Sequence, residues 1–226
     1  MKINDILNES TYNFINESKN ITFPIKNIKD SIYHIGTMNI KDRSSRESHE
    51  GKSLSVSTEP NAWAKINKGF TGGDLWLLNK KNNKFVDMVK IDNDIWDQLY
   101  SWGEQSGYFK QQTMYKYCYY DDEMDDTLCQ EFDTYEEALA EVIDDDEKDN
   151  IEKVSGAYIP TEKFKKETGT VFHKDLIVAI YCINKNINVD GLWWDEKLDI
   201  LRYSAPRGNI FDHIVHTWNI KKVNEE

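Results

Sequence analysis

The residues best suited to chemistry lie in one stretch of the chain, between Ser31 and Ile66. His34 stands beside Gly36 and Thr37, and the segment SLSVST, from Ser53 to Thr58, alternates hydroxyl and apolar side chains. This period of two is typical of a half-buried strand. A row of hydroxyls next to a strand that carries a histidine indicates the wall of a polar cleft. The alternative, which the sequence leaves open, is that His34 is a buried structural histidine at a strand end.

Three elements must position these side chains. We expect a strand through SIYHIGT, a polar loop from Lys41 to Ser53, and a second strand through SLSVS. A helix should follow at once, because Ser57 or Thr58 can cap it and Pro60 suits its first turn. Trp63 would lie on the buried face of that helix.

His34-Ile35-Gly36-Thr37, with one residue inserted, and Ser55-Val56-Ser57-Thr58 resemble the opening motifs of the ADP-ribosyltransferase-like fold, in its histidine-first branch. The resemblance implies a site for NAD, used as a substrate, and no metal. It places His34 on the ribose hydroxyls. Hydroxyl and turn residues would surround the nicotinamide, and an aromatic side chain would stack on it. The implied binding residues are Tyr33, His34, Gly36, Thr37, Ser55, Ser57, Thr58 and Trp63.

The same resemblance implies a later acidic residue on the scissile ribose. Glu196 is the first candidate, Asp195 the second, and Glu131 the third. Cleavage of the nicotinamide–ribose bond passes through an oxocarbenium-like state, which a nearby carboxylate stabilises, and the leaving group needs no general acid. The chain departs from the family here, because this stretch shows no clear Gln-x-Glu or Glu-x-Glu motif.

The resemblance therefore implies an α+β fold with split mixed and antiparallel sheets and flanking helices, in one domain over residues 1–226. The expected function is NAD-dependent mono-ADP-ribosyl transfer, of phage or toxin type, to an unidentified macromolecular acceptor. Two alternatives stay open. One is a non-catalytic protein of the same fold that binds a partner through its acidic surface. The other is an ordinary protein with a different α+β fold.

The net charge of −12 is concentrated in one segment. Residues 121–149 hold fifteen acidic side chains against one lysine, so the rest of the chain is close to neutral. We interpret this segment as an acidic helical insertion at about 121–150, with an outer face that is solvated or docks a basic protein. A general nucleic-acid-binding surface is disfavoured, because phosphate contacts need clustered Lys and Arg. Arg43 and Arg46 in the polar loop are a minor candidate for a pyrophosphate contact.

The three cysteines show no CxxC spacing and are odd in number, which favours free thiols in a reducing compartment. The first residues lack the apolar core of a signal peptide, and the longest apolar run is too short to cross a bilayer. Lysines far outnumber the four arginines, which points to an AT-rich genome. We therefore expect a cytoplasmic protein of a bacterium or of a phage-infected host cell, with no membrane contact.

Pattern and turn signals predict the remaining elements. Helices are expected over residues 1–19, over 92–103 with Gly103 as its stop, and over 133–150 with a Thr134–Glu137 capping box. Strands are expected in DLWLL, KFVDMVKI and MYKYCYYDD, in the buried run DLIVAIYCI, in GLWWDEKL, and at the final edge, IVHTWNIKKV. On that last strand, His213 and His216 would face opposite ways and could not share a metal ion.

Overall fold

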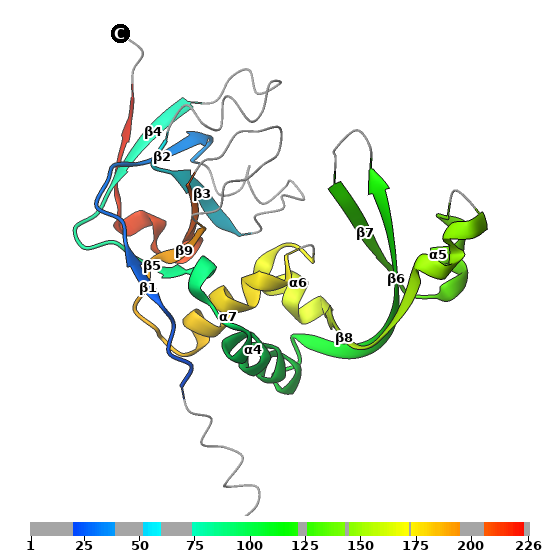
Figure 1. Cartoon of the computed structure of the whole chain (residues 1–226). Helices are drawn as coiled ribbons and strands as arrows, with labels where there is room; N and C mark the ends of the chain where they lie inside the picture. The colour runs from blue at the N-terminus through cyan, green and yellow to red at the C-terminus, as the bar shows by residue number, and fades with distance from the viewer. Residues whose placement is uncertain are drawn as a thin grey trace, which may run out of the picture.

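The structure, a computed structural model, describes residues 20–38, 52–59, 74–121, 126–142, 145–171, 173–194 and 206–223. Within these ranges the protein is α+β and has two β-sheets, as the sequence predicts. One sheet has eight strands and forms the body of the molecule. The other has three strands and projects from the body as an arm (Figure 1).

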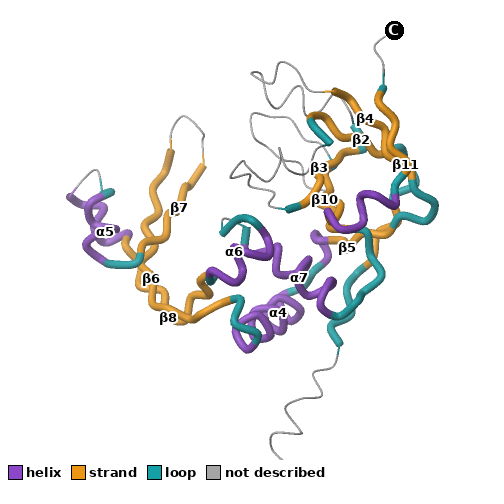
Figure 2. The backbone as a smooth tube through the Cα atoms, turned by 180° about the vertical axis from the view of Figure 1, so that it is seen from behind, coloured by secondary structure: helices purple, strands orange, loops and turns teal. Residues whose placement is uncertain are grey.

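The body sheet is mostly antiparallel and curls on itself (Figures 1 and 2). Its strands follow the order β1-β5-β9-β10-β3-β2-β4-β11, and β5 with β9 is its parallel pair among the described strands. The strands are β1 (Ile25–Asn27), β2 (Ile32–Gly36), β3 (Ser53–Ser57), β4 (Asp74–Asn79), β5 (Lys84–Asp87), β9 (Gly191–Trp194), β10 (Arg207–Phe211) and β11 (Asn219–Lys222). The two strands that carry the sequence motifs, β2 and β3, are thus neighbours.

Each face of this sheet has its own apolar core. On one face, which we call the helix face, Val86, Leu192 and Trp194 contact the helices α4 (Asn93–Gln105) and α7 (Ile177–Asn184). The opposite face, which we call the inner face, lies inside the curl and buries Leu54, Val56 and Trp193. Side chains alternate along GLWW, because Trp193 belongs to one core and its two neighbours, Leu192 and Trp194, belong to the other. Three short 3₁₀ helices, η1 (Met88–Lys90), η3 (Lys174–Leu176) and η4 (Asp212–Thr217), complete the body.

The helix predicted from residue 92 is confirmed as α4. The side chain of Asp92 caps it by accepting a hydrogen bond from the Ile95 amide, at 2.9 Å. The expected stop at Gly103 is wrong, since the helix continues to Gln105 and Gly103 is buried within it. A Cβ at that position would lie 2.7 Å from the ring of Phe109. The absence of a side chain at Gly103 therefore lets α4 pack closely against Phe109 of β6. This glycine does not end the helix.

The run DLIVAIYCI is a helix, and its assignment to a buried strand is wrong. Residues 174–176 form η3 and residues 177–184 form α7, which is apolar on nearly every side. Its ring of buried side chains, from Ile177 to Cys182, lies among α4, α6 and the body sheet. A helix buried all round has no polar face, so its period disappears and its sequence reads like that of a central strand.

The arm consists of β6 (Phe109–Asp121), β7 (Asp126–Phe132), β8 (Ile151–Pro160), α5 (Tyr135–Ala140) and the 3₁₀ helix η2 (Asp145–Asn150). The sheet order is β7-β6-β8, and α6 (Glu162–Thr168) leads the chain back into the body. The Thr134–Glu137 capping box is confirmed, but α5 ends at Ala140 instead of reaching residue 150. The acidic segment therefore also contains a strand, β7, which the sequence analysis did not predict.

Two cysteines of the arm form a disulfide, so the expectation of three free thiols is wrong. Cys118 on β6 and Cys129 on β7 are direct cross-strand partners and are bonded to each other. Cys182 is free and buried in α7. The spacing of eleven residues alone does not predict this disulfide, because the pairing of Cys118 with Cys129 depends on the register of β6 and β7.

The end of the chain is partly as expected. β11 is the edge strand beside β4, but residues 212–217 form η4 and not a strand. The premise that His213 and His216 face opposite ways on a strand is therefore wrong. The predicted helices over residues 1–19 and after Thr58 lie outside the described residues. No helix in the described part of the chain is long and apolar enough to span a membrane.

Candidate functional site

The β2–β3 junction brings the two sequence motifs into contact. His34 is 7% exposed; its Nδ1 lies 2.7 Å from the Ser55 carbonyl oxygen, and its Nε2 lies 3.3 Å from that of Thr37. Gly36 has a φ of +136°, a conformation that side chains disfavour, and its carbonyl accepts a hydrogen bond from the Trp76 indole. His34 therefore holds the end of β2 and the start of the following turn against β3.

His34 and the serines lie on different faces of the sheet. Tyr33 pairs with Ser57 across β2 and β3, and Ser57 pairs in turn with Arg207 of β10. The Arg207 guanidinium lies over the ring of Trp194, at 4.6 Å, which places this row on the helix face. His34 pairs with Trp76, which contacts the core of the inner face. The predicted site is therefore split by the sheet.

The hydroxyl row of β3 is only partly available to a ligand. Ser57 is fully buried; its hydroxyl donates to the Pro206 carbonyl at 2.6 Å and accepts from the Glu59 amide at 3.0 Å. Ser53 and Ser55 are half-buried on the same face, while Thr58 is half-buried just beyond the strand. Ser53 and Ser55 are thus the members of the row best placed to meet a ligand.

Two polar residues of β10 lie beside this row and were missed by the sequence analysis. Arg207 pairs with Ser57, and Asn209 pairs with Ser55. The Nε atom of Arg207 and the Oδ1 atom of Asn209 are both buried and have no hydrogen-bond partner within the described ranges. Buried polar atoms are nearly always paired, so two such atoms on one face indicate room for a ligand. The segment SAPRGN was the available signal, since it combines arginine and asparagine with two residues that favour turns.

None of the three candidate catalytic carboxylates is seen beside the two motifs in the described part of the structure. Asp195 and Glu196 follow the last residue of β9 but lie outside the described residues, as do Trp63, Arg43 and Arg46. Glu131 is on β7 of the arm, where it forms an ion pair with Lys174 of η3 at 3.2 Å. Glu131 therefore fastens the arm to the body and does not lie on the body sheet with the two motifs.

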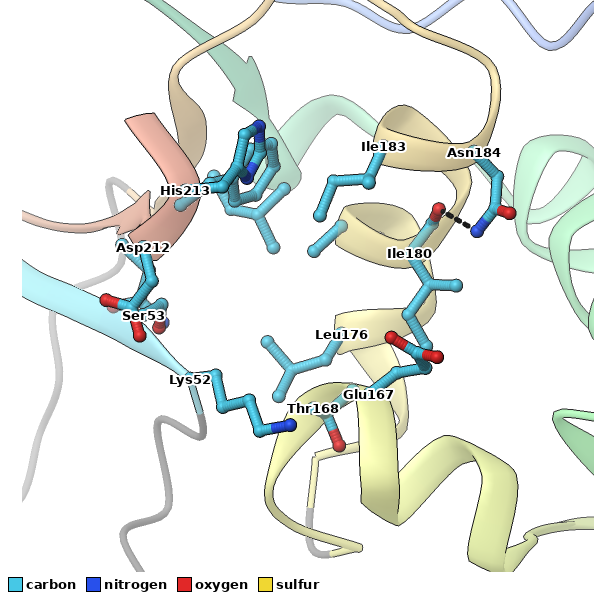
Figure 3. A pocket seen from close by; sticks show the side chains of 14 residues that line it. Lys52, Ser53, Glu167, Thr168, Leu176, Ile180, Ile183, Asn184, Asp212 and His213 are labelled. Carbon is cyan, nitrogen blue, oxygen red and sulfur yellow. Dashed lines mark hydrogen bonds between the residues drawn. The ribbon is translucent and has the colours of Figure 1, made fainter. Parts of the chain in front are cut away.

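A pocket of about 210 Å³ opens on the helix face between β3, β10, α6 and α7 (Figure 3). Its floor is made of buried, uncharged residues: Thr168, Leu176, Ile180, Leu192, Asn209 and Phe211. Lys52, Glu167, Ile183, Asn184 and His213 are exposed and form its mouth. The His213 ring stacks on that of Phe211 at 5.9 Å. Ser53 also lines the pocket, so the hydroxyl row leads into it.

The mouth of the pocket is fixed by contacts between β3 and α6. The Lys52 amide donates to the Thr168 carbonyl at 2.6 Å, and its ammonium donates to the Lys166 carbonyl. The Thr168 hydroxyl donates to the carbonyls of Phe164 and Thr170, at 2.9 and 2.7 Å. The pocket is therefore held open by fixed elements, as ligand sites usually are.

Titratable groups give little further indication of chemistry. Burial, followed by the charges of Asp175 and Glu131, raises the pKa of Tyr100, and burial raises that of Cys182 to about 12. Both groups stay protonated at neutral pH, so neither is an activated nucleophile. The described ranges contain no group of three or more His, Cys, Asp or Glu side chains that could hold a metal ion.

The arm presents the acidic surface that the charge pattern predicts. Glu136, Glu141 and Asp149 are exposed on it, and Tyr120 and Tyr135 are exposed aromatic residues of the same part of the molecule. Because the arm projects from the body, these groups can be reached by a large partner (Figure 2).

Comparisons of the chain with protein-family models, with curated proteins and with solved structures each gave no match.

Proposed function

We propose that this protein is an NAD-dependent mono-ADP-ribosyltransferase with an ADP-ribosyltransferase-like fold, acting on a macromolecular acceptor. The observation that carries the proposal is the polar row on the helix face, where Ser55 and Ser57 of β3 lie beside Asn209 and Arg207 of β10. The row holds two buried polar atoms that lack partners among the described residues. It begins in the motif on which the family resemblance depends.

Arg207 takes the role that the sequence analysis gave to Arg43 or Arg46. A guanidinium is suited to a pyrophosphate because its planar fork donates two parallel hydrogen bonds. Trp194 supports the guanidinium plane from below, and Ser57 is its direct neighbour across the strands. Tyr33, on the same face, would stack on a ring of the dinucleotide.

His34 lies on the inner face near the end of β2, so a dinucleotide bound along the row on the helix face would reach it only around that strand end. The imidazole Nδ1 lies 2.7 Å from the Ser55 carbonyl oxygen and its Nε2 lies 3.3 Å from the Thr37 carbonyl oxygen. The family resemblance implies that this ring would also contact the ribose hydroxyls.

The reaction needs one carboxylate. Glu196, or Asp195 in second place, would accept a hydrogen bond from a ribose hydroxyl and stabilise the positive charge that develops as nicotinamide leaves. Both residues follow β9 directly, and β9 pairs with β10, the strand of Arg207 and Asn209. The acceptor would enter from the side opposite the leaving nicotinamide.

The test is nicotinamide release and calorimetric NAD binding by the purified chain. Glu196→Gln should lower the release rate by about 100-fold or more while leaving NAD affinity within about threefold. Arg207→Ala should instead weaken binding. Glu131→Gln is the matched control, since its carboxylate belongs to the arm, and it should change neither quantity. Absence of saturable NAD binding by the unmodified chain would overturn the proposal.

A second candidate function is favoured by the exposed acidic arm. In that case the protein keeps the fold but acts by binding a basic protein, and turnover is absent. Neutralising Glu136, Glu141 and Asp149 together should then weaken binding of a basic polypeptide such as polylysine and flatten its salt dependence. The matched control neutralises three exposed acids of the body, Asp30, Asp94 and Asp97. Equal losses in both variants would mean that only net charge matters, which contradicts a docking role for the arm.

A further inference from the structure

The pocket between β10 and α7 has a binding group at its floor that the fold leaves unused. Asn209 is only 3% exposed and lines the pocket. Its Oδ1 atom is buried and has no hydrogen-bond partner in the part of the chain that the structure describes. Leaving such a buried acceptor unpaired lowers the stability of the folded protein. A ligand that donates an N–H to this atom would remove that cost.

The composition of the pocket limits the ligand. The floor is uncharged and largely apolar, so a charged group would be desolvated there without a counter-ion. Lys52 and Glu167 belong to the exposed mouth, and Asp212 is a half-buried acidic residue of the lining. We therefore expect a neutral, flat ring on the floor, with any charged substituent of the ligand at the mouth, where Lys52 and Glu167 lie (Figure 3).

The volume gives a second limit. Pockets for drug-sized ligands measure about 300–1,000 Å³. At about 210 Å³ this pocket suits a single ring system and not a whole dinucleotide. Ile180 of α7 and Leu192 of β9 offer apolar contact to such a ring, with Phe211 beside them.

We propose that this pocket binds an adenine base, held at its edge by Asn209. The asparagine amide can accept from the adenine 6-amino group through Oδ1 and donate to N7 through Nδ2, a paired geometry that asparagine commonly uses on adenine. Guanine offers two acceptors, O6 and N7, along the same edge and leaves Oδ1 unpaired. Cytosine offers a donor and an acceptor, but its smaller ring covers less of the apolar floor.

Asn209 also belongs to the polar row on which the proposed function depends, but adenosine binding can be measured without NAD turnover, so the two proposals can fail separately. The ribose and any phosphates would leave through the mouth, near Lys52. Adenine, adenosine and adenosine monophosphate share the recognised base, and their relative affinities show how much the mouth contributes.

The experiment is calorimetric titration of the full chain with adenosine, guanosine and cytidine, repeated with adenine and adenosine monophosphate. Adenosine should bind saturably, with an affinity about 10- to 100-fold above that of guanosine. Asn209→Leu should remove this preference and lose at least about tenfold in adenosine affinity. Its melting temperature should not fall, because the substitution removes an unpaired polar atom. A purely structural Asn209 predicts the opposite shift in melting temperature.

Two further variants keep the test decisive. Ala179→Leu fills the pocket from α7 without removing a polar group, so it should block adenosine even if Asn209→Leu does not fold. Asn219→Leu, on the exposed edge strand β11, is the matched control and should bind as the unmodified chain does. Equal affinity for the three nucleosides, or no binding at millimolar concentration, would overturn the proposal. NAD turnover without adenosine binding would leave only the transferase proposal standing.

Discussion

Gly191 sets the distance between β9 and β10 at the centre of the body sheet. A Cβ built at this residue would lie 1.8 Å from the backbone carbonyl oxygen of Asn209, far inside contact distance. The obstacle is a backbone atom of a paired strand, so no side chain can rotate away. We expect Gly191→Ala to lower the free energy of unfolding by about 3 kcal/mol or more, measured by urea denaturation.

Gly107 provides the control for this substitution. Its backbone has a φ of +75°, which side chains disfavour, but a Cβ there would meet no atom within 4 Å. Gly107→Ala should therefore cost only the strain of its backbone, about 1 kcal/mol. A similar cost at both positions would show that crowding between β9 and β10 is not what requires glycine at residue 191.

We expect the Cys182 thiol to be unreactive toward thiol reagents in the folded protein. It is 1% exposed, and burial raises its pKa from 9.0 to about 12. The thiolate is the reactive form, so a disulfide reagent at pH 8 should label Cys182 only after unfolding. The unfolded chain releases this proton near pH 9 and the folded chain near pH 12, so this group makes stability fall as pH rises through that range. Rapid labelling of the native protein would contradict the burial of this thiol.

At the scale of single residues, the sequence identified only some of the residues that form the candidate site. His34 and the β3 serines were found because hydroxyls alternating with apolar residues mark a strand with one polar face. Arg207 and Asn209 were missed because nothing in a sequence states which strands will be neighbours. Their importance depends on the pairing of β10 with β3, which joins segments about 150 residues apart.

At the scale of elements, local signals were reliable where they were polar and specific. The Thr134–Glu137 capping box was predicted, and the sequence offered Asn93 or Asp92 as the cap of α4, of which Asp92 is the one used, since caps depend on a few adjacent residues. Periodicity failed where burial was complete, as in α7. It also failed where acidic residues concealed an alternating strand, as in β7, because the charge of the segment suggested a solvated helix.

The β6–β7 hairpin is the element that the disulfide should stabilise most. Closing a loop of this size is worth about 2–3 kcal/mol in the chain-entropy account. Cys129→Ser should therefore reduce hydrogen-exchange protection in β6 and β7, with little change in α4 and the body strands. Mass spectrometry of peptides before and after reduction would verify the Cys118–Cys129 link itself. Equal loss of protection in arm and body would contradict the independence of the hairpin.

At the scale of the whole molecule, the distal part of the arm, residues 113–156, contributes no residue to either core of the body. The two apolar cores of the body draw their buried residues from segments before Met114 and after Val154. The base of the arm packs with the body, because Phe109 of β6 belongs to a body core and Tyr158 of β8 packs against that core. Beyond this base, the Lys174–Glu131 ion pair links the arm to the body. An exposed ion pair contributes little stability, about 0–1 kcal/mol.

We therefore expect the body to fold without the distal arm. Gln112 and Ala157 are direct partners on β6 and β8, so residues 113–156 can be replaced by an Asn-Gly turn that closes a hairpin at this point. The shortened chain should unfold cooperatively, with a melting temperature within a few degrees of the full chain, and should keep adenosine binding in the α7 pocket. It should also lose all of the net negative charge, and with it any affinity for a basic polypeptide. Failure to fold would mean that the arm, despite its exposed position, completes a core of the body.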